Sequence, residues 1–244
     1  LIHIPLVLAY AAWNRGSLWP NAPKLMALRT LATVINFVAG VSAFTVLPLA
    51  EAYVIFFSMP LMISVLAIPV LGERMDPVRG IAVVLGLVGV AIALDPTTTP
   101  LNMGHGLAFA GAILGAMNYV MIRKTGSVER TPVMLLWPQL ALVPLACAAT
   151  PFVYAPMGPT DFAVAAFMAC VLFVGALAIV VAYRKAPAII IAPMQYSQIG
   201  WAALFGALIF GETMSGGTVL GCVLIALAGI VVVARQDRVR AAAS

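Results

Sequence analysis

The chain has 244 residues, of which 64% are hydrophobic and 9% are charged, and its formal net charge is +5. Its mean hydropathy of +1.10 lies far above the range of soluble globular domains and excludes that class. The basic residues lie in or beside the connections between apolar runs, so the positive charge indicates orientation in a membrane and excludes a nucleic-acid partner.

Nine apolar segments follow one another along the chain. All but the first have about the 20 residues that a membrane-spanning helix needs. The segments are predicted at residues 1–12, 25–47, 50–71, 77–94, 103–122, 132–153, 161–183, 188–210 and 217–234. The first opens at Leu1 without an initiator Met and is too short to span, so we expect the chain to lack its beginning. The short connections predict one all-α polytopic membrane helix bundle.

Charge alternates between successive connections, which predicts the orientation of every segment. Acids occupy the connections that lack basic residues, at Glu51, Asp95, Asp161 and Glu212. The basic residues are Arg15, Lys24 and Arg29; Arg74 and Arg79; Arg123, Lys124 and Arg130; Arg184 and Lys185; and Arg235, Arg238 and Arg240. Because positive side chains stay in the cytoplasm, we expect a multi-pass protein of the cell (plasma or inner) membrane with a cytoplasmic carboxyl terminus.

Residues in the first half of the chain match residues in the second half at a constant separation. This repeat interval is the separation in sequence between Phe44 and Tyr183. The matching residues are Phe44, Pro48, Phe57, Ser58, Gly72, Glu73 and Met75 against Tyr183, Pro187, Tyr196, Ser197, Gly211, Glu212 and Met214. Five helices, an odd number, separate the copies, so they must have opposite orientations in the membrane. We therefore predict inverted repeats at residues 1–96 and 97–244. Inverted repeats are typical of secondary transporters, which bind substrate near the midplane and expose it alternately to each side.

Three segments stand out along the chain: LPLAEA at 47–52, SMPLMISVLAIPVLGERM at 58–75 and FGALIFGETM at 205–214. In these segments the chain resembles the EamA family of the drug/metabolite transporter superfamily. This resemblance implies ten helices in two inverted five-helix repeats, with one complete helix before the first segment. It also implies a carrier of an amino acid, a nucleoside-like compound such as S-adenosylmethionine, a vitamin or a drug. One departure is Gln198 with Ile199, where many members carry a proline like Pro60; Pro193 stands earlier and could compensate.

Polar and aromatic residues at membrane depth are the candidate substrate-binding residues, because unpaired polar groups are costly in hydrocarbon. Gln195, Gln198 and Trp201 recur at three-residue spacing and are expected on one helix face, with Tyr196 beside them. The remaining candidates are Tyr53 and Phe57 in the third segment, Asn36 in the second and Asn118 in the fifth. This set suits a substrate recognised by neutral hydrogen bonds and ring stacking. The alternative is that the amides only join helices.

The acidic residues are interpreted as structural. Glu73 and Glu212 end corresponding helices at the membrane surface, where a carboxylate stays solvated or pairs with a neighbour such as Arg74. Glu51 is the best placed acid for proton coupling, although a carboxylate is also favourable in the first turn of a helix.

Two other functional classes remain as alternatives, a membrane channel and a membrane-embedded enzyme. The sequence contains neither an HExxH nor a GxSxG motif, which disfavours the enzyme. Cys147, Cys170 and Cys222 are an odd number without a CxxC pair, so no metal or cofactor is expected. The expected partners are a small-molecule substrate and the lipid bilayer. A homodimer is left open, although one chain would suffice for a transport pathway.

Overall fold

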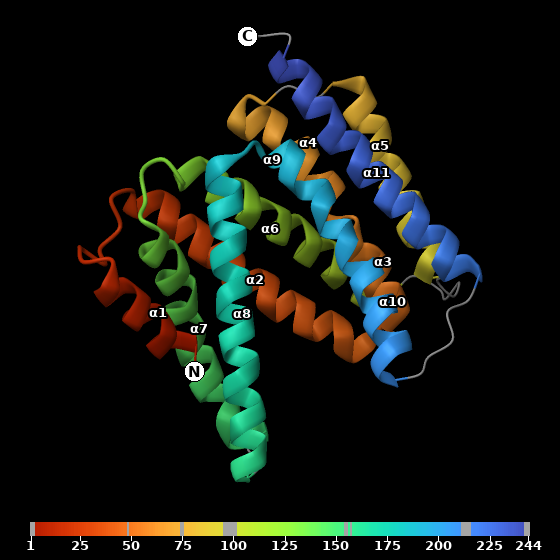
Figure 1. The fold of residues 1–244 in the computed structure, drawn as a ribbon. Helices are drawn as coiled ribbons and strands as arrows, with labels where there is room; N and C mark the ends of the chain where they lie inside the picture. Colours follow the sequence, from red (N-terminus) through yellow and green to blue (C-terminus); the bar gives the residue numbers. More distant parts are fainter. Residues whose placement is uncertain are drawn as a thin grey trace. The chain divides into compact units, whose positions relative to one another are not determined.

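A computed structural model describes residues 3–47, 49–73, 76–94, 102–153, 156, 158–210 and 216–241. Every regular element within these residues is a helix, which confirms the all-α class (Figure 1). The elements are α1 (His3–Trp13), α2 (Pro23–Val46), α3 (Leu49–Phe57), α4 (Met59–Leu71), α5 (Pro77–Leu94), α6 (Met103–Thr125), α7 (Thr131–Val153), α8 (Pro159–Lys185), α9 (Ala188–Ile191), the 3₁₀ helix η1 (Ala192–Tyr196), α10 (Ser197–Phe210) and α11 (Gly216–Ala241).

The helices agree with the predicted segments, except that the third and the eighth segments are interrupted. In the third, Pro60 has no N–H to donate to the carbonyl of Phe56, so α3 ends and α4 begins around Ser58. The Ser58 hydroxyl donates a 2.5 Å hydrogen bond to the Ile55 carbonyl and so satisfies the end of α3. In the eighth, the segment that contains Pro193 forms η1 between α9 and α10. At both positions a proline therefore accompanies the interruption of the helix.

The first residues of corresponding helices are separated by the same interval as the matching residues of the sequence. Helix α3 begins at Leu49 and α9 begins at Ala188, and these two residues are separated by the same interval as Phe44 and Tyr183. Helices α5 and α11, which begin at Pro77 and Gly216, are separated by this interval as well. Residues 49–71 and 188–210 therefore each contain a helix, a proline-associated break and a second helix in the same order, and the repeat itself stays a prediction.

The chain forms two compact units. Unit 1 contains residues 1–34 and 121–185, and unit 2 contains residues 35–120 and 186–244. Each unit thus takes elements from both predicted repeats.

Unit 1 brings three basic connections together at one end. The Arg130 guanidinium donates to the carbonyls of Asn14 and Arg15 at 2.8 and 3.0 Å. The Arg184 guanidinium donates to the Gly126 carbonyl at 2.8 Å and to the Thr131 hydroxyl. Arginine thus satisfies backbone carbonyls of the loops.

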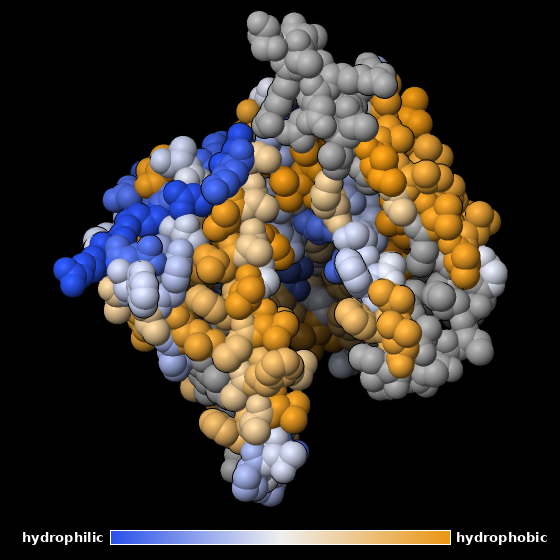
Figure 2. Space-filling view, in the orientation of Figure 1, coloured by the Kyte–Doolittle hydropathy of each residue, from blue (hydrophilic) through white to orange (hydrophobic). Residues whose placement is uncertain are grey.

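The outer surface of the helices is apolar, as a lipid-facing surface must be. On α8, Phe167 is 70% exposed and Leu172 is 64% exposed, and a patch of this kind is rare on a soluble monomer. Figure 2 shows apolar residues over much of the visible surface of both units. Among the described residues, four helices, α2, α6, α7 and α8, are long and apolar enough to cross a membrane.

Unit 2 is built around the pairing of α5 with α11. The two helices approach closely because Gly89 has no side chain: a methyl group added there would lie 3.0 Å from the Gly221 carbonyl oxygen. Helix α4 packs against α9 and η1. The core of unit 2 therefore combines helices from residues 1–96 with helices from residues 97–244.

Candidate functional site

Unit 2 contains a pocket with a volume of about 460 Å³, which lies within the usual range of roughly 300–1,000 Å³ for small-molecule sites. Three groups of helices form its walls: the second half of α2, the region of the α3–α4 break together with α6, and the η1–α10 segment. The lining residues are Asn36, Phe37, Gly40, Val41, Phe44, Tyr53, Phe56, Phe57, Met59, Pro60, Tyr119, Gln195 and Gln198.

Four aromatic side chains from α2 and α3 form one wall. The ring of Phe44 lies 5.3 Å from that of Phe56 and 5.6 Å from that of Tyr53, measured between centroids. Tyr53 in turn stacks on Phe57 at 5.7 Å with an interplanar angle of 23°. These separations are typical of favourable aromatic pairs. We call Phe44, Tyr53, Phe56 and Phe57 the aromatic wall; it offers flat, polarizable surface to a ligand.

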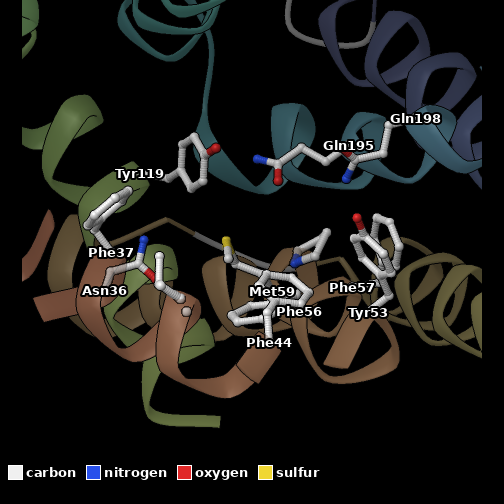
Figure 3. A pocket seen from close by; sticks show the side chains of 13 residues that line it. Asn36, Phe37, Phe44, Tyr53, Phe56, Phe57, Met59, Tyr119, Gln195 and Gln198 are labelled. Atoms are coloured by element: carbon white, nitrogen blue, oxygen red, sulfur yellow. The ribbon is translucent and has the colours of Figure 1, made fainter. Parts of the chain in front are cut away.

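Two carboxamides from the second repeat lie opposite this wall. Figure 3 shows Gln195 of η1 and Gln198 of α10 extending over the pocket above Tyr53, Phe57 and Met59. In the same view the Tyr119 hydroxyl points toward the Gln195 amide. Each carboxamide supplies two donors and one acceptor oxygen, so this amide wall can hydrogen-bond the edge of a flat polar ring. The described lining residues include no Asp, Glu, Lys, Arg or His.

Two glycines of α6 allow the pocket to reach its present depth. A methyl group added at Gly115 would lie 2.7 Å from Met59 Cε and 3.4 Å from Asn36 Oδ1. A methyl group added at Gly111 would lie 3.2 Å from Phe56 Cε1. Small residues spaced four apart commonly let membrane helices pack closely. Here the side chains packed on these two glycines are residues of the pocket itself.

Five of the eight residues predicted for the site line this pocket. They are Asn36, Tyr53, Phe57, Gln195 and Gln198. Aromatic side chains from residues 1–96 and carboxamides from residues 97–244 therefore line one pocket in unit 2. Whether these side chains contact substrate stays a prediction.

The other three predicted residues lie elsewhere. Tyr196 is 1% exposed and packs in a core cluster with Val90, Ile199 and Ile225. Trp201 is 57% exposed and stacks on Phe205, with the ring centroids 6.1 Å apart. Of the three residues expected on one face, Gln195 and Gln198 share the pocket, whereas Trp201 does not line it. Asn118 is half-buried on α6 and is absent from the described lining.

The lining also includes residues that were not selected from the sequence. Phe37, Val41 and Phe44 of α2 belong to this group. Asn36, Gly40 and Phe44 are spaced four apart and therefore share one face of α2, which is the signal that could have identified Phe44. The side chain of Glu51 and the residues Arg74, Asp95 and Glu212 lie outside the part of the chain that the structure describes.

Comparison with known proteins gives one family and a consistent set of relatives. Residues 1–94 match the EamA-like transporter family. The chain is 24% identical to the S-adenosylmethionine uptake transporter of Rickettsia prowazekii (strain Madrid E), over 98% of this chain and 80% of that protein. It is 24% identical to the riboflavin transporter of Vibrio cholerae serotype O1, over 74% of this chain and 61% of that protein. A crystal structure with 18% sequence identity has the same fold, with a TM-score of 0.82 over 98% of this chain and 85% of that one.

The apolar helical bundle, the neutral pocket and the similarity to carriers define a multi-pass membrane protein that transports a small molecule and is not an enzyme. The lipid bilayer is its environment. Within this class the chain is a secondary transporter, and its residues 1–94 are similar to the EamA-like transporters of the drug/metabolite transporter superfamily.

Proposed function

We propose that this protein carries a small metabolite with a flat, nitrogen-containing ring across the cell membrane by alternating access. The ring lies against the aromatic wall, and Gln195 and Gln198 hydrogen-bond its polar edge. The observation that carries this proposal is the placement of these carboxamides opposite four aromatic rings in one pocket of about 460 Å³.

The relatives suggest which rings to test first. S-adenosylmethionine contains an adenine ring and riboflavin contains an isoalloxazine ring, and both rings are flat and carry hydrogen-bonding nitrogens. S-adenosylmethionine also carries a positively charged sulfonium, which the faces of Phe and Tyr rings attract when the charge lies within about 6 Å of a ring centroid. An uncharged pocket with an aromatic wall suits both compounds, and S-adenosylmethionine is the first candidate because four of the curated relatives bear that name.

The recurrence of element boundaries at the interval of the sequence repeat supports the proposed mechanism. We take residues 1–96 and 97–244 as the two inverted repeats, which would exchange conformations to open the pocket to each side in turn. The basic end of unit 1 would face the cytoplasm together with the carboxyl terminus. One chain supplies both walls of the pocket, so a homodimer, if formed, would not be needed to complete the site.

Counterflow in proteoliposomes tests the function. Liposomes loaded with unlabelled S-adenosylmethionine should accumulate the labelled compound transiently and with saturation, and riboflavin is tested in parallel. A channel would instead give flux without counterflow. If folded protein exchanges neither compound nor other ring-bearing metabolites, the proposal is wrong.

The variant Gln198→Ala tests the site. The loss of one hydrogen bond to substrate removes about 1 kcal/mol of binding free energy, which corresponds to roughly a fivefold rise in KM. Gln139→Ala is the matched control, because Gln139 belongs to α7 in unit 1 and carries the same side chain. Equal KM values for the two variants would rule out the amide wall.

A further inference from the structure

The end of α4 directs Glu73 away from its own helix. Gly72 adopts a left-handed conformation with φ of 68°, and its N–H donates to the Ile68 carbonyl at 3.0 Å. The N–H of Glu73 donates to the Ala67 carbonyl at 3.3 Å. The bond from Gly72 to Ile68 is that of the αL capping motif, which closes the helix with a residue that tolerates positive φ. The Gly-Glu pair therefore ends α4 and turns the chain in one step.

The Glu73 carboxylate caps a helix from the other repeat. One of its oxygens accepts the N–H of Ala188 at 2.9 Å, and the other accepts the N–H of Ile189 at 3.0 Å. These are the first two N–H groups of α9, which have no partner within their own helix. Pro187 precedes them and supplies no side-chain cap. The sequence predicted a solvated carboxylate or one paired with a neighbour; the structure shows a helix cap 115 residues away in the chain.

The cost of losing this cap is high because the start of α9 is buried. Ala188 and Ile189 are 0% and 1% exposed, so water cannot readily replace the carboxylate. A buried N–H without a partner is costly, and hydrogen bonds to a charged acceptor are among the strongest in proteins. Glu73 therefore holds α9 against the end of α4.

The capped helix leads directly to the amide wall. Gln195 lies seven residues after Ala188 in the continuous α9–η1–α10 segment, and α4 packs against both α9 and η1. At its other end α4 begins with Met59 and Pro60, which line the pocket. The cap thus joins the helix that leads to the amide wall to a helix whose first residues also line the pocket.

From this geometry we infer that Glu73 is a positioning residue of the transport site: by capping α9 it holds Gln195 and Gln198 in place opposite the aromatic wall. The expected effect of this cap on transport rests on the proposed function. The capping geometry itself does not depend on which metabolite is carried.

The first test measures position without substrate. Cys147, Cys170 and Cys222 are replaced by Ala, Gln195→Cys is introduced, and its reaction with a small polar maleimide is timed in purified protein. Glu73→Ala should raise the labelling rate at least threefold, because α9 is released and the walls separate. Glu73→Gln keeps one acceptor oxygen and should give an intermediate rate. It also serves as the test if the Ala variant does not fold.

The control removes an equivalent cap elsewhere. Asp161 accepts the Gly158 N–H at 3.0 Å at the start of α8 in unit 1, so Asp161→Asn perturbs a helix cap outside unit 2. It should leave the labelling rate of the introduced cysteine unchanged. A Glu73 variant that is monodisperse on size exclusion and labels at the parental rate would overturn the inference.

The second test separates positioning from stability. In counterflow of S-adenosylmethionine, Glu73→Gln should raise KM several-fold, whereas a merely structural role would lower the yield of folded protein and leave KM unchanged. Faster labelling of the introduced cysteine in a protein that exchanges no metabolite would sustain the positioning role and refute the proposed function. An unchanged KM beside parental labelling would refute the positioning role alone.

Discussion

The substitution Gly115→Ala tests the depth of the pocket. The added methyl group would lie 2.7 Å from Met59 Cε and 3.1 Å from Met59 Sδ. Carbon atoms in contact normally lie about 3.5–4.0 Å apart, so the Met59 methyl group must move by about 1 Å. Because Met59 lines the pocket, the displaced thioether takes space from the substrate.

The structure also indicates how large the effects on folding and on binding should be. The atoms that must move are the far end of an unbranched, flexible side chain, so the cost to folding should be about 1 kcal/mol or less. The loss of space beside the substrate should cost a similar amount of binding free energy, about 1 kcal/mol, which is roughly a fivefold rise in KM. The expected result is a transporter of nearly parental thermal stability with weaker binding.

Counterflow of S-adenosylmethionine and thermal unfolding of the purified protein provide the two measurements. Gly106→Ala is the control, because Gly106 lies on the same helix and a methyl group added there meets no atom within 4 Å. In a Met59→Ala background the effect of Gly115→Ala on KM should disappear, since the clashing side chain is gone. If Gly115→Ala raised KM equally in the parental and the Met59→Ala proteins, or in neither, the predicted clash with Met59 would be refuted.

Two further predictions concern stability and are measured by thermal unfolding of purified protein. Gly89→Ala places a methyl group 3.0 Å from the Gly221 carbonyl oxygen, which cannot move aside, so α5 and α11 must separate at a cost of about 1–3 kcal/mol. Its Tm should fall by several degrees, while Gly175→Ala, where no atom lies within 4 Å, should keep the parental value. Arg184→Lys should also lower Tm, because an ammonium group cannot reproduce the two directed bonds of the guanidinium, to the Gly126 carbonyl and to the Thr131 hydroxyl. Parental Tm values for Gly89→Ala or Arg184→Lys would contradict these expectations.

Hydropathy and loop charge were enough to predict the helical spans. A helix in lipid must satisfy its own backbone, so length and apolar composition locate it without knowledge of its neighbours. The internal repeat could also be read from matching residues, and the starts of α3 and α9 then agreed with its interval. The break at Ser58 was foreseeable only in part, because Pro69 lies inside α4 without interrupting it.

The candidate site was only partly predictable. Gln195 and Gln198 stood out as polar residues at membrane depth, where few exist. Tyr196 seemed equivalent to them, yet the 3₁₀ turn of η1 places it in the core, where its ring lies 2.8 Å from the position of a methyl group added at Gly86. Glu73 was interpreted from its immediate neighbours in the chain, whereas its partners are 115 and 116 residues away.

The amino-acid sequence alone was therefore sufficient for the class of protein, the spans, the basic connections and the family resemblance, because each of these depends on local composition. The tertiary fold decided which faces of the helices meet, and with them the aromatic wall, the glycines beneath it and the cap on α9. In a soluble protein the polar face of a helix reveals its orientation. Here lipid and protein interior are both apolar, so a helix such as α8 or α10 is hydrophobic on every side and its sequence does not show which side faces a neighbour.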